Sequence, residues 1–191
     1  MGAARVPRPL SRAALAVDEP LTLRRLPGDS AGRWLYRMSE WFALAGGAIF
    51  VGVAMMSVGS IVSRALFSRP IQGDYELVQV GCAVFVSLCL PICQMASANI
   101  IVDFFTTRAA VATQRRLDAI GALLLGLVMA LIAWRMVSGT VSLREAGETT
   151  TILGWPVWYT YALMIPGVAL TALAGLHGAW VHWRAASAGT A

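Results

Sequence analysis

The sequence contains no lysine and few charged residues of any kind. Charged side chains make up 13% of its 191 residues, against about a quarter in an ordinary soluble domain, while hydrophobic residues make up 58%. The mean hydropathy of the chain is +0.67. A surface that faces water on all sides needs more charge than this, so the composition excludes an ordinary soluble domain and favours an integral membrane protein.

Residue patterns that carry enzyme or cofactor chemistry are also missing. The sequence has no GxxxxGK[ST] phosphate loop, no zinc-spaced cluster and no Gly-x-Ser-x-Gly elbow. Its two histidines, His177 and His182, lie close together near the end of one apolar run, whereas a haem in a helical bundle takes ligands from separate helices. We therefore expect no enzyme, no cofactor, no metal site and no nucleic-acid partner.

Four apolar windows are long enough to cross a bilayer, whose hydrocarbon core of about 30 Å needs about 20 helical residues. The windows are continuous rather than alternating, which favours helices over barrel strands. The sequence thus predicts an all-α integral membrane protein with one transmembrane domain, residues 33–184. Its predicted spans are residues 41–63, 77–97, 118–143 and 157–182.

Aromatic residues mark both ends of the last window. From Trp158 to Trp180 a helix rises about 33 Å, close to the hydrocarbon thickness. Amphipathic rings collect at the headgroup level on each side of a membrane. The predicted interface anchors are Trp34, Trp41, Trp155, Trp158, Tyr159, Trp180 and Trp183.

The distribution of the fifteen basic residues, all arginine, predicts the orientation. Seven arginines precede the first window, three lie between the second and third, and one follows the fourth, whereas the opposite side has Arg64, Arg69 and Arg144. Basic residues accumulate on the cytoplasmic side. Both termini are therefore predicted to be cytoplasmic, with a disordered tail at residues 1–32 and a short tail at residues 185–191.

Two further segments have an amphipathic pattern. RWLYRMSEWF, from Arg33 to Phe42, gathers its apolar residues on one helical face, which predicts an interfacial helix before the first span. ANIIVDFFTTRAAVATQRR, from Ala98 to Arg116, sets Ile and Phe against polar residues. This pattern predicts a second surface helix, between the second and third spans, with Asn99 as its cap.

The second window carries a polar stripe. Wound at 100° per residue, six residues from Glu76 to Ser97 fall within about 60° of one line. Polar side chains are costly in lipid, so the stripe is predicted to pack against another helix, with a solute or ion path as the alternative. The candidates for contact with a partner, including two from the surface segment, are Glu76, Gln79, Ser87, Gln94, Asn99 and Asp103.

Small residues form comparable stripes in two other windows, and such stripes let helix backbones approach closely in lipid. The first window has Ala45, Ala48, Gly52, Gly59 and Ser63; the fourth has Gly167, Thr171, Ala174, Gly175 and Gly178. Arg135, within the third window, is interpreted as an anchor that extends toward the outer surface or pairs with another group.

Three motifs in a fixed order resemble a known family. SRPIQGDYELVQ (Ser68 to Gln79) leads into the second span, ANIIVDFF follows that span, and GETTTILGWPVWYTYALMIPG (Gly147 to Gly167) leads into the fourth. Together they resemble the small membrane subunit of tripartite ATP-independent periplasmic (TRAP) transporters, the DctQ-like family. The resemblance covers Trp34 to Trp183. Met95 to Asn99 lack the basic residue and the histidine that usually precede Ile-x-Val-Asp, so no role of that histidine is transferred.

The resemblance implies a four-helix scaffold for a larger, DctM-like transport subunit in the bacterial inner membrane. In such systems the large subunit moves solute with sodium, and a periplasmic binding protein delivers a small organic acid. The outer loops would then face the periplasm and offer docking residues, with solvated charges that have no partner as the alternative. These candidates are Arg64, Arg69, Asp74, Arg144, Glu145 and Glu148. A self-sufficient four-helix transporter and a membrane anchor of another complex remain the alternative functions.

Overall fold

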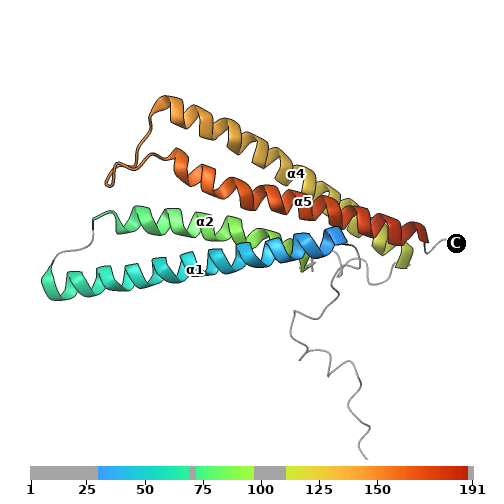
Figure 1. Ribbon diagram of the computed structural model, residues 1–191, viewed down its shortest axis with the longest axis horizontal. Helices are drawn as coiled ribbons and strands as arrows, with labels where there is room; N and C mark the ends of the chain where they lie inside the picture. The colour runs from blue at the N-terminus through green and yellow to red at the C-terminus, as the bar shows by residue number, and fades with distance from the viewer. Residues whose placement is uncertain (1–29, 69–71, 97–110, 189–191) are drawn as a thin grey trace, which may run out of the picture.

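The structure is a computed structural model that describes residues 30–68, 72–96 and 111–188, with side chains for residues 117–184 of the last segment. These residues form four long helices and no strand (Figure 1). The helices are α1 (Ser30–Phe67), α2 (Asp74–Met95), α4 (Val111–Ala146) and α5 (Trp158–Ala188). Each helix is long and apolar enough to cross a membrane. The prediction of an all-α chain with four helices of spanning length is confirmed.

α1 is one continuous helix of 38 residues. At about 1.5 Å per residue it is about 57 Å long, nearly twice the thickness of a hydrocarbon core. The predicted lead-in, Arg33 to Phe42, is therefore helical but belongs to the same helix as the first span. Its position at the membrane surface stays a prediction. Residues 98–110 of the other predicted surface helix lie outside the described residues, and residues 111–116 form the start of α4.

The four helices lie side by side in a single layer in the order α1, α2, α5, α4 (Figure 1). α1 packs on α2, α2 on α5 and α5 on α4. α1 also meets α5 at a few residues, whereas the described parts of α1 and α4 do not meet. The helices draw together toward the end of α5 and spread apart toward residues 147–157 (Figure 1). We call this second end, where α1 and α4 finish, the outer end. α1 and α4 are the two edges of the layer.

Glycine and alanine bring α4 and α5 together. A Cβ atom on Gly126 would lie 2.9 Å from the backbone nitrogen of Leu176, and one on Gly175 would lie 2.9 Å from Gly126 Cα. Buried alanines continue this contact along both helices, namely Ala119, Ala122, Ala174 and Ala179. Such close backbone approach provides van der Waals packing where lipid gives no hydrophobic drive for association.

The small-residue stripe predicted in the fourth span packs inside the chain. Gly167 lies directly against the Ser87 carbonyl of α2, and Thr171 is buried beside it. The stripe predicted in the first span behaves differently, because a Cβ atom on Gly52 or Gly59 would meet nothing within 4 Å. α1 contacts α2 through another face, where Gly46 lies against the backbone and side chains of α2.

α4 ends in a glycine-dependent turn. Gly147 has a φ of 65°, a left-handed conformation that favours glycine. The N–H groups of Gly147 and Glu148 donate hydrogen bonds to the carbonyls of Arg144 and Leu143, at 3.3 and 3.4 Å. This is the Schellman arrangement, which satisfies carbonyls left free at the end of a helix. It directs the chain into the loop that leads to α5.

Candidate functional site

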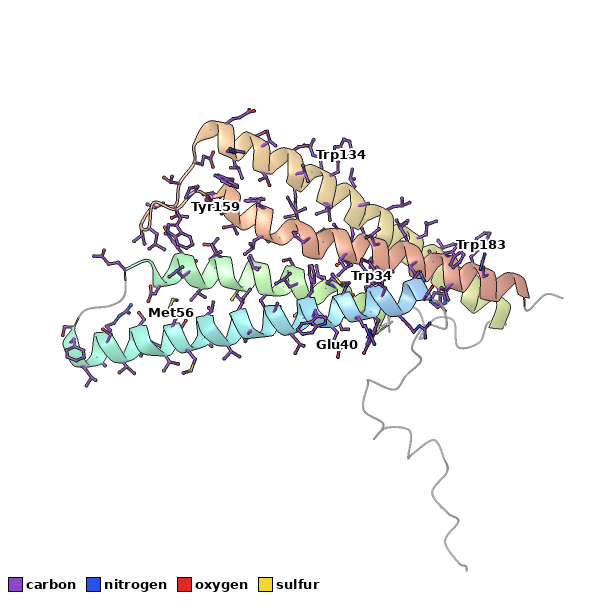
Figure 2. All side chains as sticks on the ribbon, viewed as in Figure 1. Trp34, Glu40, Met56, Trp134, Tyr159 and Trp183 are labelled. Atoms are coloured by element: carbon purple, nitrogen blue, oxygen red, sulfur yellow. The ribbon has the colours of Figure 1, made fainter. Side chains whose placement is uncertain are left out.

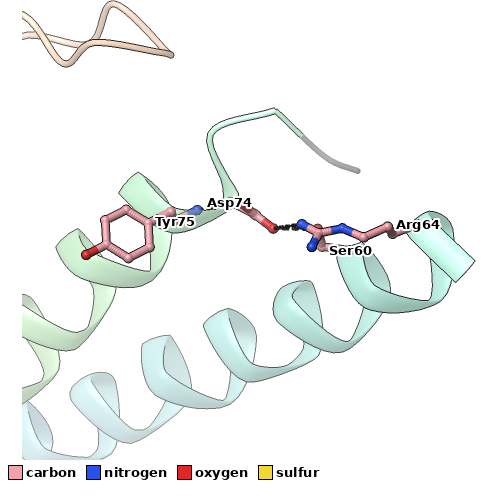
Figure 3. A network of polar contacts seen from close by, with 4 residues as sticks. All are labelled: Ser60, Arg64, Asp74 and Tyr75. Carbon is pink, nitrogen blue, oxygen red and sulfur yellow. Dashed lines mark hydrogen bonds and ion pairs between the residues drawn. The ribbon is translucent and has the colours of Figure 1, made fainter. Parts of the chain in front are cut away.

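The outer ends of α1 and α2 are joined through Asp74, the first residue of α2. The Ser60 hydroxyl donates a hydrogen bond to Asp74 Oδ2 at 2.6 Å, and the backbone N–H of Tyr75 donates to Oδ1 at 2.7 Å (Figure 3). Arg64 Nη2 lies 3.9 Å from the same Oδ2. Two predicted docking residues, Arg64 and Asp74, thus pair with each other, while 65% of the Arg64 side chain stays exposed.

The chain from Gly147 to Val157 forms a compact loop that we call the outer hairpin. The N–H of Thr150 donates to the Trp155 carbonyl at 2.8 Å, and the N–H of Val157 donates to the Glu148 carbonyl at 3.0 Å. The Thr150 hydroxyl also accepts a hydrogen bond from the N–H of Trp155, at 3.1 Å. These bonds hold the two arms of the hairpin together, so its tip has a defined place.

Glu76 binds the tip of the outer hairpin to the start of α2. The backbone N–H groups of Ile152 and Leu153 donate to Glu76 Oε1 and Oε2, at 2.8 and 3.0 Å. Both carboxylate oxygens are therefore used within the chain. Gly73 lies under the tip with a φ of 78°, and a Cβ atom there would fall 2.5 Å from Leu153 Cγ. Glycine fits both the conformation and the space at this position.

The polar stripe predicted on the second span does not form one continuous exposed seam. Ser87 is 2% exposed, and its hydroxyl donates to the Val84 carbonyl at 2.8 Å. A side chain from another protein has no access to it in this arrangement. Gln79 is exposed and Gln94 is half-buried. The other two partner candidates, Asn99 and Asp103, lie outside the described residues.

Three of the remaining docking candidates, Arg144, Glu145 and Glu148, lie at the base of the outer hairpin. The Arg144 guanidinium lies 5.4 Å from the centre of the Trp158 ring, a cation–π distance. Glu145 and Glu148 are exposed beside it, while Arg69 lies outside the described residues. The outer hairpin thus connects Arg144, Glu145 and Glu148 to the start of α2, because Glu76 accepts hydrogen bonds from the tip of the hairpin.

Six of the seven predicted interface anchors are exposed, and Trp158 is half-buried. The ring of Trp158 stacks on Tyr159 with centroids 3.9 Å apart. At the other end of α5, the Arg184 guanidinium lies 3.8 Å from the centre of the Trp180 ring. The exposure of these rings is compatible with contact to headgroups, and their role as anchors stays a prediction.

The hydrogen bonds between Glu76 and the outer hairpin were not predicted from the sequence. The bonded residues are 76 and 77 positions apart, so no local pattern pairs them. The available signals were a carboxylate at the start of a helix and turn-forming glycines at positions 73 and 147. Among the described residues no group of three or more His, Cys, Asp or Glu side chains is placed to hold a metal ion.

Comparison with family models matches residues 53–185 to the family described as "Tripartite ATP-independent periplasmic transporters, DctQ component". The matched region begins within α1 and includes α2, α4, the outer hairpin and most of α5. Comparisons with curated proteins and with solved structures give no match. The family match covers well over half of the chain and contains all three motifs noted in the sequence. The chain therefore belongs to the DctQ family, the small component of the TRAP transporters.

Proposed function

We propose that this chain scaffolds the large, DctM-like subunit of a TRAP transporter in the bacterial inner membrane. The observation that carries the proposal is the DctQ family match over residues 53–185. The open layer supports it, because both edge helices have faces that the described chain leaves uncovered. Met55 in α1 and Leu124 in α4 are 70% and 64% exposed. Faces of this kind are free to pack against helices of another subunit.

In this proposal the large subunit carries out sodium-coupled uptake of a small organic acid, which a periplasmic binding protein delivers. The positions of two charged residues favour a scaffold over a self-sufficient transporter. Glu76 uses both carboxylate oxygens to hold the outer hairpin, and Arg135 is exposed on α4. A transporter that works alone would gather such groups around a path inside the protein.

We also propose that the outer end faces the periplasm, with both termini in the cytoplasm. The arginine distribution supports this orientation. The outer hairpin and the exposed side chain of Arg64 would then be accessible to the binding protein. Charged residues at such a surface steer the encounter between two proteins and make its rate depend on salt.

Affinity purification from the native membrane tests the scaffold function. A tagged chain would be extracted in mild detergent, and the proteins that remain bound would be identified by mass. We expect a larger multi-helix membrane protein in equal amount. Vesicles that contain this chain alone should show no solute uptake, and uptake should require the large subunit and the binding protein. Recovery of the chain alone as a stable, monodisperse species would contradict the proposal.

A further inference from the structure

The side of α4 that points away from α5 carries an arginine among apolar residues. Six exposed residues fall within about 45° of one line at 100° per residue. They are Leu124, Leu127, Leu131, Arg135, Ser138 and Ser142, which we call the outward face of α4. α5 packs on the other side, at Ala122 and Gly126. Figure 2 shows Trp134, the neighbour of Arg135, on the edge of the layer away from α5.

The register between α4 and α5 gives the depth of Arg135. Gly126 lies against Gly175 in this antiparallel pair, so Arg135 lies level with Pro166. Pro166 is about one helical turn from the midpoint between Trp158 and Trp180, and about 12 Å from the level of Trp158. If these two tryptophans mark the headgroup levels, Arg135 lies near the middle of the hydrocarbon core.

Arg135 has no hydrogen bond or ion pair with any residue that the structure describes. The two serines of the outward face differ, because their hydroxyls donate to carbonyls of their own helix, those of Trp134 and Ser138. An arginine at this depth is costly in lipid, and such residues are almost always paired or turned toward protein. Extension to the outer headgroups would need the guanidinium to cover about 12 Å along α4.

We propose that the outward face of α4 is the contact surface for the large membrane subunit, and that Arg135 pairs with a carboxylate on a transmembrane helix of that subunit. The inference rests on the proposed function, which supplies the partner. At this depth a carboxylate of another protein would neutralise the charge of Arg135, whereas acyl chains would not, so a protein is the favoured neighbour of this face. The leucines on the inner half of the face, such as Leu124 and Leu131, would pack against the same helix. α4 is an edge of the layer, so the described chain leaves this whole face open.

Substitution of Arg135 tests the pairing. Arg135→Leu removes the charge but makes α4 more apolar, so the chain should still insert into the membrane. We expect the amount of large subunit that co-purifies with the tagged chain to fall at least about tenfold, because the carboxylate of the large subunit would be left buried without the positive charge of Arg135. Arg135→Lys should restore part of the binding. Arg37→Leu, which removes an exposed arginine from α1, is the matched control and should retain the wild-type ratio.

Photo-crosslinking from position 131 gives an independent measurement. This position lies one turn from Arg135 on the same face, and we expect a covalent product with the large subunit. Equal co-purification by wild type and Arg135→Leu, or capture of lipid alone at position 131, would overturn the inference and leave the proposed function standing. If the wild-type chain itself retains no large membrane protein, the proposed function fails, and the inference fails with it.

Discussion

The contact between Gly126 and Gly175 gives the most direct test of how the layer is held together. In Gly126→Ala the new Cβ atom would lie 2.9 Å from the Leu176 backbone nitrogen and 3.2 Å from the Gly175 carbonyl carbon. Non-bonded heavy atoms prefer about 3.5–4.0 Å. Both close atoms belong to the backbone, so no side chain can turn away, and α4 and α5 must separate by at least about 0.6 Å.

Overpacking of this kind costs about 1–3 kcal/mol. For a chain of this size the melting temperature changes by about 2–4 °C per kcal/mol, so Gly126→Ala should melt about 2–12 °C below Gly121→Ala, which gains the same helix preference from alanine. Gly121→Ala, on the same helix, is the matched control, because its Cβ atom would meet nothing within 4 Å. Alanine favours helix over glycine by up to about 1 kcal/mol, so this control should melt at or slightly above the wild-type temperature.

Thermal unfolding of the purified chain in mild detergent, followed by tryptophan fluorescence, measures both variants under the same conditions. The double variant Gly126→Ala/Gly175→Ala should be less destabilised than the sum of the single changes, because the first separation already makes room for the second methyl group. Equal melting temperatures for Gly126→Ala and Gly121→Ala would refute the argument that this close approach holds α4 on α5.

Three further predictions concern the outer end. In Glu76→Gln, one of the two bonds to the outer hairpin loses its acceptor, so amide hydrogen exchange at Ile152 and Leu153 should become faster, while exchange in α5 stays unchanged. In Gly73→Ala, the left-handed backbone costs about 1–2 kcal/mol and the methyl group displaces Leu153, so exchange at the hairpin tip should rise even with Glu76 intact; unchanged exchange would show that the tip is held elsewhere. In Arg64→Glu, uptake by the assembled transporter should be several-fold slower at low salt and near wild type at high salt; equal salt dependence would exclude Arg64 from docking.

The presence of four helices of spanning length could be predicted from sequence because bilayer thickness sets the length of an apolar helix, and length and composition are local properties. Each predicted window overlaps one helix of the structure, while the bounds of the spans in a membrane stay a prediction. The packing stripe of α5 could also be predicted, since Gly167, Thr171 and Gly175 recur at helical spacing and all three are buried. Small residues at a regular helical interval allow close backbone approach whichever helix lies against them, so this property can be predicted without knowing the neighbour.

The order of the helices could not be predicted in this way. α2 lies beside α5 because Gly167 admits the Ser87 carbonyl, a contact between residues far apart in the sequence. The polar pattern of the second span was compatible with a contact to another protein, but at Ser87 that neighbour is α5. The stripe in α1 shows the opposite case, because Gly52 and Gly59 have the same periodicity as the α5 stripe and no described residue packs on them. Periodicity shows that a face is suited to close packing, and tertiary structure determines which face is used.

The layer is one helix thick over most of its length, because α1 meets α5 at only a few residues, and this has a mechanical consequence. A bundle resists bending because its helices brace one another around a shared centre, whereas a single row can flex along each line where two helices meet. The lines made of glycine and alanine, such as that between α4 and α5, have few side chains to lock the angle between neighbours. The curvature of such a layer then depends on the surface of the partner or the lipid that it packs against. We therefore expect the angles between the helices of this subunit to be determined by the protein and lipid that it contacts in the membrane.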